Sequence, residues 1–235
     1  MMENSVILRL LRKMPTDARI SAIRALTEML TVEENEAGCV EVETSSILVV
    51  AFLTEQSKDK DEEVRSAVAE NPRTPSAVLT ELSKDGAVEV RCAVGRNPKT
   101  PKKVLTELSK DLVWNWKVRC AVAGNPSIPE ETLKKLSKDP VWKVRNAVAE
   151  NPRTPFAVLT ELSKDESYRV RRAVAGNPGT PPAVLTELST DKDWHVRYDV
   201  ARNPRTPPAV LTELSKDEDE WDVQKAARDN PSFPK

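Results

Sequence analysis

Arginine and aspartate recur in register along this chain, a pattern that could bind anions. The arginine of each copy follows an aspartate by six residues, or by eight in one copy. The arginines are Arg65, Arg91, Arg119, Arg145, Arg171 and Arg197, and the aspartates are Asp59, Asp85, Asp111, Asp139, Asp165 and Asp191. A row of guanidinium groups could bind phosphates, but a carboxylate paired with each one would cancel its charge. We therefore expect an Asp/Arg ladder that joins neighbouring copies rather than a phosphate-binding stripe.

A second row consists of asparagines that each precede a proline. They are Asn71, Asn97, Asn125, Asn151, Asn177, Asn203 and Asn230, at spacings of 26, 28, 26, 26, 26 and 27 residues. Such amides could line a ligand groove, but Asn at a helix end also bonds the backbone of turns, and we favour this second role. A unit of this length cannot enclose a core alone, so the copies must stack into a solenoid.

Each copy contains two short helices, as the segment 71–97 illustrates. Thr74 is expected to cap the first helix and Pro75 to begin it, and Asp85 is expected to cap the second. The inward apolar residues are Val78, Leu79 and Leu82 in the first helix and Val90, Ala93 and Val94 in the second. Pro98 then ends the second helix, which could be α or 3₁₀.

These repeated segments resemble the leucine-rich repeat variant family. The resemblance rests on Ala-Val-Ala-Glu-Asn-Pro-Arg-Thr-Pro at 67–75 and 147–155 and on the recurring Val-Leu-Thr-Glu-Leu-Ser-Lys-Asp. It implies an all-α, right-handed superhelical solenoid of short helix pairs, α with α or 3₁₀, without β-sheet. The Asp-x-x-x-x-Val-Arg spacing is also similar to that of HEAT-like repeats. Family members can carry a cysteine-rich iron–sulfur module before the repeats, but only Cys39 lies there, so we expect no cofactor.

The repeats are expected to occupy residues 46–235, as about seven units of 26 residues. Residues 1–45 are expected to form an N-terminal helical cap, with a helix that Thr16 caps and an acidic surface loop at 33–43. The apolar stripe of that helix is Ile20, Ile23, Leu26 and Leu30. At the other end, Arg228 replaces a small residue of the earlier copies, which we interpret as a terminal cap.

Three positions vary freely among the copies: the residue after the row arginine, the residue before Asn and the residue after Pro. The first two lie four residues apart on one helix and therefore share a face. A fixed framework with a free face is typical of a binding scaffold, although drift at solvated positions gives the same pattern. The residues expected to contact a partner are Arg73, Arg96, Lys99, Asn146, Arg153, Arg172, Tyr198, Arg202 and Arg205.

A row of aromatic residues precedes the row arginines by three positions. It consists of Trp116, Trp142, Tyr168, Trp194 and Trp221. We expect these rings to pack against the preceding helix as hydrophobic staples, with Trp142 and Trp194 mostly buried. A stacking strip for peptides or bases is the alternative. Trp114 lies in a two-residue insertion, so we expect it to be exposed and include it among the partner-binding residues.

Other chemistry is sparse in this sequence. The three cysteines lack the Cys-x-x-Cys spacing of a zinc site, and the one histidine, His195, excludes a His-rich metal site. No nucleophile, paired-carboxylate or phosphate-loop motif is present, so we expect neither an enzyme nor a small-molecule substrate. The 36 basic and 37 acidic residues are balanced, which does not indicate a bulk polycation for nucleic acid.

The sequence therefore predicts a monomeric, cytoplasmic scaffold that binds a protein or peptide on its variable face and has no membrane partner. A nucleic-acid binder is the alternative, because Arg96, Lys99, Arg153, Arg202 and Arg205 occupy variable positions. Salt separates the two hypotheses, since binding through phosphates weakens steeply as salt rises.

Overall fold

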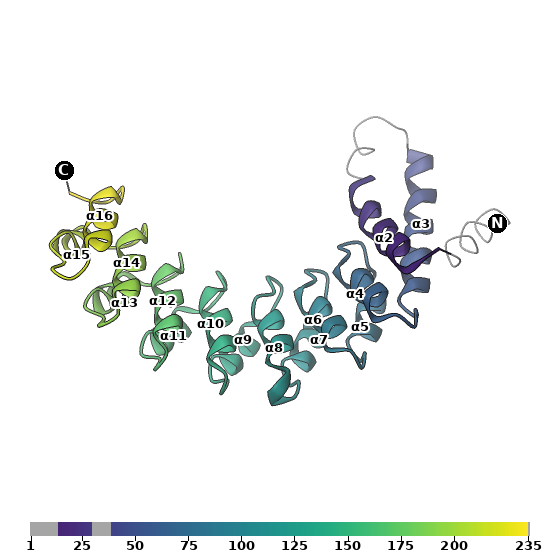
Figure 1. Cartoon of the computed structure of the whole chain (residues 1–235), viewed down its shortest axis with the longest axis horizontal. Coiled ribbons are helices and arrows are strands. Elements are labelled where there is room, and N and C mark those ends of the chain that lie inside the picture. The colour runs from purple at the N-terminus through teal and green to yellow at the C-terminus, as the bar shows by residue number, and fades with distance from the viewer. Residues whose placement is uncertain (1–13, 30–38, 235) are drawn as a thin grey trace. The chain divides into compact units, whose positions relative to one another are not determined.

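The computed structural model of this chain describes residues 14–29 and 39–234. It forms two compact units, Met1–Ser127 and Ile128–Lys235. Within the described ranges every regular element is helical and no strand occurs, as the repeat pattern predicts (Figure 1). The all-α repeat architecture is therefore confirmed.

The first unit contains seven α-helices in its described part. They are α2 (Thr16–Met29), α3 (Cys39–Gln56), α4 (Glu62–Glu70), α5 (Ser76–Leu82), α6 (Val88–Arg96), α7 (Lys102–Leu108) and α8 (Trp116–Ala123). A 3₁₀ turn, η2 (Val113–Asn115), precedes α8. The second helices of these repeats, α4, α6 and α8, pack one on the next.

The second unit contains eight α-helices in its described part. They are α9 (Glu130–Leu136), α10 (Trp142–Glu150), α11 (Phe156–Leu162), α12 (Tyr168–Gly176), α13 (Pro182–Leu188), α14 (Trp194–Arg202), α15 (Pro208–Leu214) and α16 (Trp221–Asp229). The second helices α10, α12, α14 and α16 lie side by side, and the first helices form another row beside them (Figure 1). All the second helices are α, so the 3₁₀ alternative is wrong for them.

The core lies between the two rows of helices in each unit. Leucines of the first helices and valines of the second helices face each other there, which follows from their helical spacing. The leucines with no exposed surface are Leu53, Leu79, Leu105, Leu133, Leu159, Leu185 and Leu211. The matching valines are Val64, Val90, Val118, Val144, Val170, Val196 and Val223.

The caps differ from the sequence prediction. The hydroxyl of Thr74 donates to the carbonyl of Val68 instead of capping α5, and Pro75 takes the N-cap position. Asp85 does not cap α6 either, because its carboxylate accepts from the backbone of Ala87 in the turn before the helix. Both side chains close the links between helices. The aspartate recurs in every copy, and the threonine recurs in all but those with Ile128 and Phe233.

At the N-terminal end, α2 begins at Thr16 and packs on α4. Ile23 is buried, and its carbonyl accepts from the amide of Asn71. Helix α3 runs through the expected boundary at residue 45 and includes residues 39–43, so the loop prediction is wrong for those five positions. The rest of the acidic stretch and the side chains of Leu26 and Leu30 lie outside the described residues.

Candidate binding grooves on the second helices

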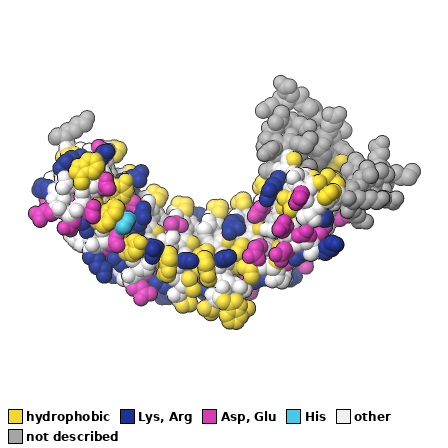
Figure 2. Space-filling model, in the orientation of Figure 1, with side chains coloured by type: hydrophobic (Ala, Val, Ile, Leu, Met, Phe, Trp, Pro, Cys, Tyr) yellow, Lys and Arg dark blue, Asp and Glu magenta, His cyan; other side chains and the backbone are white. Residues whose placement is uncertain are grey.

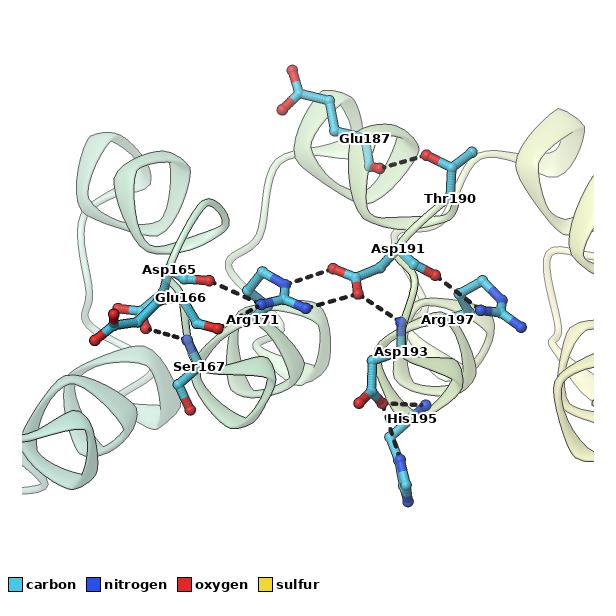
Figure 3. Close-up of polar contacts among 10 residues, drawn as sticks. All are labelled: Asp165, Glu166, Ser167, Arg171, Glu187, Thr190, Asp191, Asp193, His195 and Arg197. Carbon is cyan, nitrogen blue, oxygen red and sulfur yellow. Dashed lines mark hydrogen bonds and ion pairs between the residues drawn. The ribbon is translucent and has the colours of Figure 1, made fainter.

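Five of the row arginines form the expected ladder with aspartates, and each of these five contacts two successive links between helices. Arg171 donates from Nε and Nη2 to the carboxylate of Asp191, at 2.6 and 2.9 Å, and from Nη1 to the carbonyl of Asp165 at 2.9 Å (Figure 3). The aspartate six residues earlier thus supplies its backbone, and the aspartate of the next repeat supplies its carboxylate. The same carboxylate pairing joins Arg65 with Asp85, Arg91 with Asp111, Arg145 with Asp165 and Arg197 with Asp217.

This ladder holds the arginine heads away from solvent. The side chains of Arg145 and Asp165 are 11% and 7% exposed. Arg119 donates to the carbonyls of residues 111–113. Guanidinium groups bonded in this way have few donors left for a phosphate, so the structural interpretation of the row is confirmed.

The ladder also shifts the pKa of its carboxylates. The hydrogen bond from Arg65 holds the pKa of Asp85 below its ordinary value, and burial opposes this shift without reversing it. For Asp191, burial raises the pKa, but the hydrogen bonds from Arg171 and from the backbone of Asp193 outweigh burial, so the pKa is again lowered.

We expect the free energy of unfolding to decrease with acid below about pH 4, the ordinary pKa of aspartate. A lowered folded-state pKa gives stability that is complete above the unfolded pKa and is lost as pH falls through the folded pKa. Urea unfolding of the intact chain between neutral pH and pH 2 measures this effect. In the variant Asp85→Asn the free energy of unfolding should fall less steeply with acid than in the parent. Glu81→Gln removes a carboxylate of an exposed pair and should leave the steepness unchanged. If the free energy of unfolding of Asp85→Asn depended on pH as steeply as that of the parent, this carboxylate would not contribute to the acid dependence of stability.

The asparagine row forms a second ladder, made with the backbone. Asn203 donates from Nδ2 to the carbonyls of Ala175 and Asn177, at 2.7 and 3.0 Å, and accepts at Oδ1 from the backbone of Arg205. Asn97, Asn125, Asn177 and Asn230 repeat this arrangement. Since both amide hydrogens and the oxygen are used in buried bonds, the expected structural role is confirmed.

The small residues two positions before Asn pack tightly, as their size predicts. Ala69, Ala123, Ala149, Ala175 and Ala201 have no exposed surface. A Cβ atom added to Gly95 would lie 3.1 Å from the Cβ of Ala121 and 3.3 Å from the backbone nitrogen of Val122. Only a small residue lets α6 approach α8 this closely.

Grooves run between successive second helices on the face opposite the core. The largest of the three described here, about 590 Å³, lies between α10 and α12. Trp142, Asn146 and Glu150 line one side, at positions i, i+4 and i+8 of α10, and Tyr168 and Arg172 line the other. Grooves of about 430 and 420 Å³ lie between α14 and α16 and between α6 and α8. The aromatic row and the variable positions therefore share one face, although the sequence suggested two separate surfaces.

Polar contacts order the side chains of the α10/α12 groove. Arg172 pairs with Asp199 of α14 at 2.7 Å, and this hydrogen bond raises the pKa of Arg172. Asn146 donates to Glu150 at 2.8 Å. The guanidinium of Arg169 lies 5.0 Å from the ring centroid of Trp142 and 4.8 Å from that of Tyr168. These contacts join α10, α12 and α14 across the groove.

The aromatic rings differ in how much of their surface is buried. Trp142 and Trp194 each keep only a minor part of their surface exposed, whereas Trp221 is 63% exposed. Trp142 lines the groove, and Trp194 stacks on His195 with the centroids 3.8 Å apart. The predicted burial of both rings is therefore confirmed, although Trp142 also lines the groove between second helices. Trp114 is 74% exposed, as expected.

The structure separates the residues predicted to bind a partner into two groups. Those that line grooves are Arg96, Asn146, Arg172, Tyr198 and Arg202. Those outside the three grooves are Arg73, Lys99, Arg153 and Arg205, beside the Asn-Pro turns, and Trp114 in η2. Arg205 donates to the carbonyl of Gly179 and lies over the ring of Phe156.

Sequence reasoning missed two charged residues of the α10/α12 groove, Arg169 and Asp199. Asp199 could have been found, because other copies have alanine at this position. Arg169 follows the aromatic position of its own helix, and its contact with Trp142 of the preceding repeat depends on how closely the helices approach. No helix of the described ranges is long and apolar enough to cross a membrane. Nor do the described His, Cys, Asp and Glu side chains form a group of three that could hold a metal ion.

Stacked pairs of short helices, joined by side-chain ladders, define a helical repeat protein. Residues 62–86, 116–141 and 168–193 match the family model of the leucine rich repeat variant. A solved structure, titled a leucine-rich repeat variant with a novel repetitive structural motif, is 29% identical over 88% of this chain and 81% of its own, with a TM-score of 0.56. Three segments of the chain therefore match the leucine-rich repeat variant model, and the chain is similar in fold to a solved member of that class.

A more distant likeness is to the crystal structure of an engineered protein. It is 17% identical and covers 97% of this chain and 77% of its own, with a TM-score of 0.42. No curated protein matches the sequence.

Proposed function

We propose that this chain is a non-enzymatic scaffold that binds a protein or peptide in the grooves between its second helices. The observation that carries the proposal is the α10/α12 groove, where half-buried rings and polar groups meet at positions that vary among the repeats. Its volume of about 590 Å³ is sufficient for a few side chains of a partner segment. The Asp/Arg and Asn ladders join neighbouring repeats, so the groove residues are available for contacts with a partner.

Nucleic acid is less well supported as a partner. The row arginines are already bonded to carboxylates and carbonyls. Carboxylates also line the grooves themselves: Glu150 and Asp199 in the α10/α12 groove, and Asp222 and Asp229 in the α14/α16 groove. Figure 2 shows acidic side chains beside the basic ones on the viewed face. These carboxylates would repel a phosphate backbone but are compatible with a peptide.

Site-specific photo-crosslinking in lysate from source cells tests the proposal. A benzophenone amino acid at the groove positions Asn146 and Tyr198 should crosslink the intact chain to a protein. The same amino acid at Lys164, exposed after the first helix α11, is the matched control. The crosslink should persist when salt is raised about fourfold, because few phosphate contacts are involved. Crosslinking to nucleic acid, or a product only from Lys164, would contradict the proposed function.

A further inference from the structure

Arg169 is the side chain that sets the charge of the α10/α12 groove. It is exposed, and its guanidinium lies over Trp142 of the preceding repeat and over Tyr168 of its own helix. A cation over aromatic faces is held by the electrostatic attraction of the rings, which fixes its orientation. Stacking uses the face of a guanidinium and leaves its N–H donors at the edge free to bond. Within the described residues, the contacts of Arg169 are with these rings and not with a carboxylate.

Two of the other charges in this groove pair with each other. The Nε of Arg172 donates to Asp199 at 2.7 Å, so the positive charge of one offsets the negative charge of the other. Glu150 accepts from Asn146 of its own helix α10, a bond that orients the carboxylate but leaves its negative charge in place. Arg169 therefore supplies a charged donor that is oriented and has no anionic partner in the groove.

We infer that the α10/α12 groove takes a peptide segment in which a carboxylate side chain adjoins an apolar one. This inference rests on the proposed function and names the chemistry of the partner. The carboxylate pairs with Arg169 through the charge-assisted bonds that guanidinium makes best. The neighbouring apolar side chain covers Trp142, which is half-buried and lines the same groove. A large ring beside an oriented arginine is the composition that dominates binding energy at protein interfaces.

Two other occupants fit this groove less well. A basic peptide would be repelled by Arg169 and would have to compete with it for the two rings. Single-stranded nucleic acid could stack on Trp142 and Tyr168, but its successive phosphates would meet Glu150 and Asp199. A single carboxylate requires only the one unpaired guanidinium.

Nuclear magnetic resonance titration of the intact chain tests the inference with defined probes. The probes are the blocked heptapeptides Gly-Ser-Leu-X-Leu-Ser-Gly, where X is Glu, Gln or Lys, and a ten-residue oligothymidylate. The side-chain signals of Arg169 Nε–H and Trp142 Nε1–H report occupancy of the groove. We expect the Glu peptide to bind about tenfold more tightly than the Gln peptide, as one charged hydrogen bond predicts. The Lys peptide should bind most weakly.

Three variants assign the preference to particular side chains. Arg169→Gln should abolish the preference for Glu over Gln. Asp199→Asn releases Arg172 and should strengthen binding of the Glu peptide. Arg153→Gln, an exposed arginine outside the groove, should leave the titration unchanged.

The contrary outcomes are distinct from one another. Equal binding of the Glu and Gln peptides, or a preference for Lys, would overturn the inference while leaving the groove a peptide site. Stronger groove shifts with oligothymidylate would overturn it in favour of nucleic acid. If no peptide shifts the groove signals, both the inference and the proposed function fail for this groove.

Discussion

Leu159→Ala should lower the free energy of unfolding by about 2–5 kcal/mol, the range for leucines whose removal leaves a cavity. Leu159 has no exposed surface and lies on α11, where first and second helices pack together. A repeat contacts only its neighbours, so the cavity cannot be relieved by a distant rearrangement of the core. Urea unfolding of the intact chain, followed by circular dichroism, measures the change.

Phe156→Ala is the matched control on the same helix. Phe156 is larger than Leu159 but is 60% exposed, so its removal should change the free energy by no more than about 0.5 kcal/mol. If the Leu159→Ala variant were as stable as the parent, Leu159 would not belong to the core. Equal losses in both variants would mean that size rather than burial determines the effect.

Arg145→Ala should cost about 3 kcal/mol, because it leaves the buried carboxylate of Asp165 without its partner. Arg145 donates to this carboxylate at 2.6 and 3.0 Å and to the carbonyl of Asp139 at 2.9 Å. These bonds connect one repeat with the next, so their loss should weaken the contact between repeats as well as the local turn. The unfolding free energy at neutral pH is the appropriate measurement.

A double-mutant cycle isolates the ladder contact. Removing both partners, in Arg145→Ala with Asp165→Ala, should cost less than the sum of the two single variants, because no buried charge is left unpaired. Arg153→Ala provides an exposed arginine of the same repeat as the control. Additive losses in the cycle would contradict the ladder, since independent residues have no coupling energy.

The repeat period and the two ladders could be predicted because each depends on residue types that recur in register. A contact inferred for one copy applies to the others, because the same residue types recur there. A recurring row of Asp and Arg can form few kinds of contact other than ion pairs between neighbouring copies. The helix starts could not be placed as well. The hydroxyl of Thr74 can cap its own helix or donate to the end of the preceding helix, and only the folded turn shows that it donates to the carbonyl of Val68. Local propensity does not decide between two acceptors.

Predicting the groove requires information that the sequence of a single repeat does not contain. The sequence shows that Trp142 and Asn146 are four residues apart, but Arg169 reaches Trp142 only because α12 lies beside α10. Contacts between repeats depend on how closely the helices approach, which small residues such as Ala149 and Ala175 set. For the same reason the sequence did not show that the ring of Trp142 also lines the groove between second helices.

The ladders hold the repeats together, whereas the groove side chains are available to bind, and this division of roles predicts different effects of substitution on stability. The unfolding free energy of the double variant Asn146→Ala with Arg169→Gln, compared with Asn203→Ala, tests it most directly. Asn203 is 3% exposed and its amide bonds two carbonyls, so Asn203→Ala should lose about 2 kcal/mol. The groove variant should remain within about 0.5 kcal/mol of the parent. A loss in the groove variant as large as that in Asn203→Ala would contradict the claim.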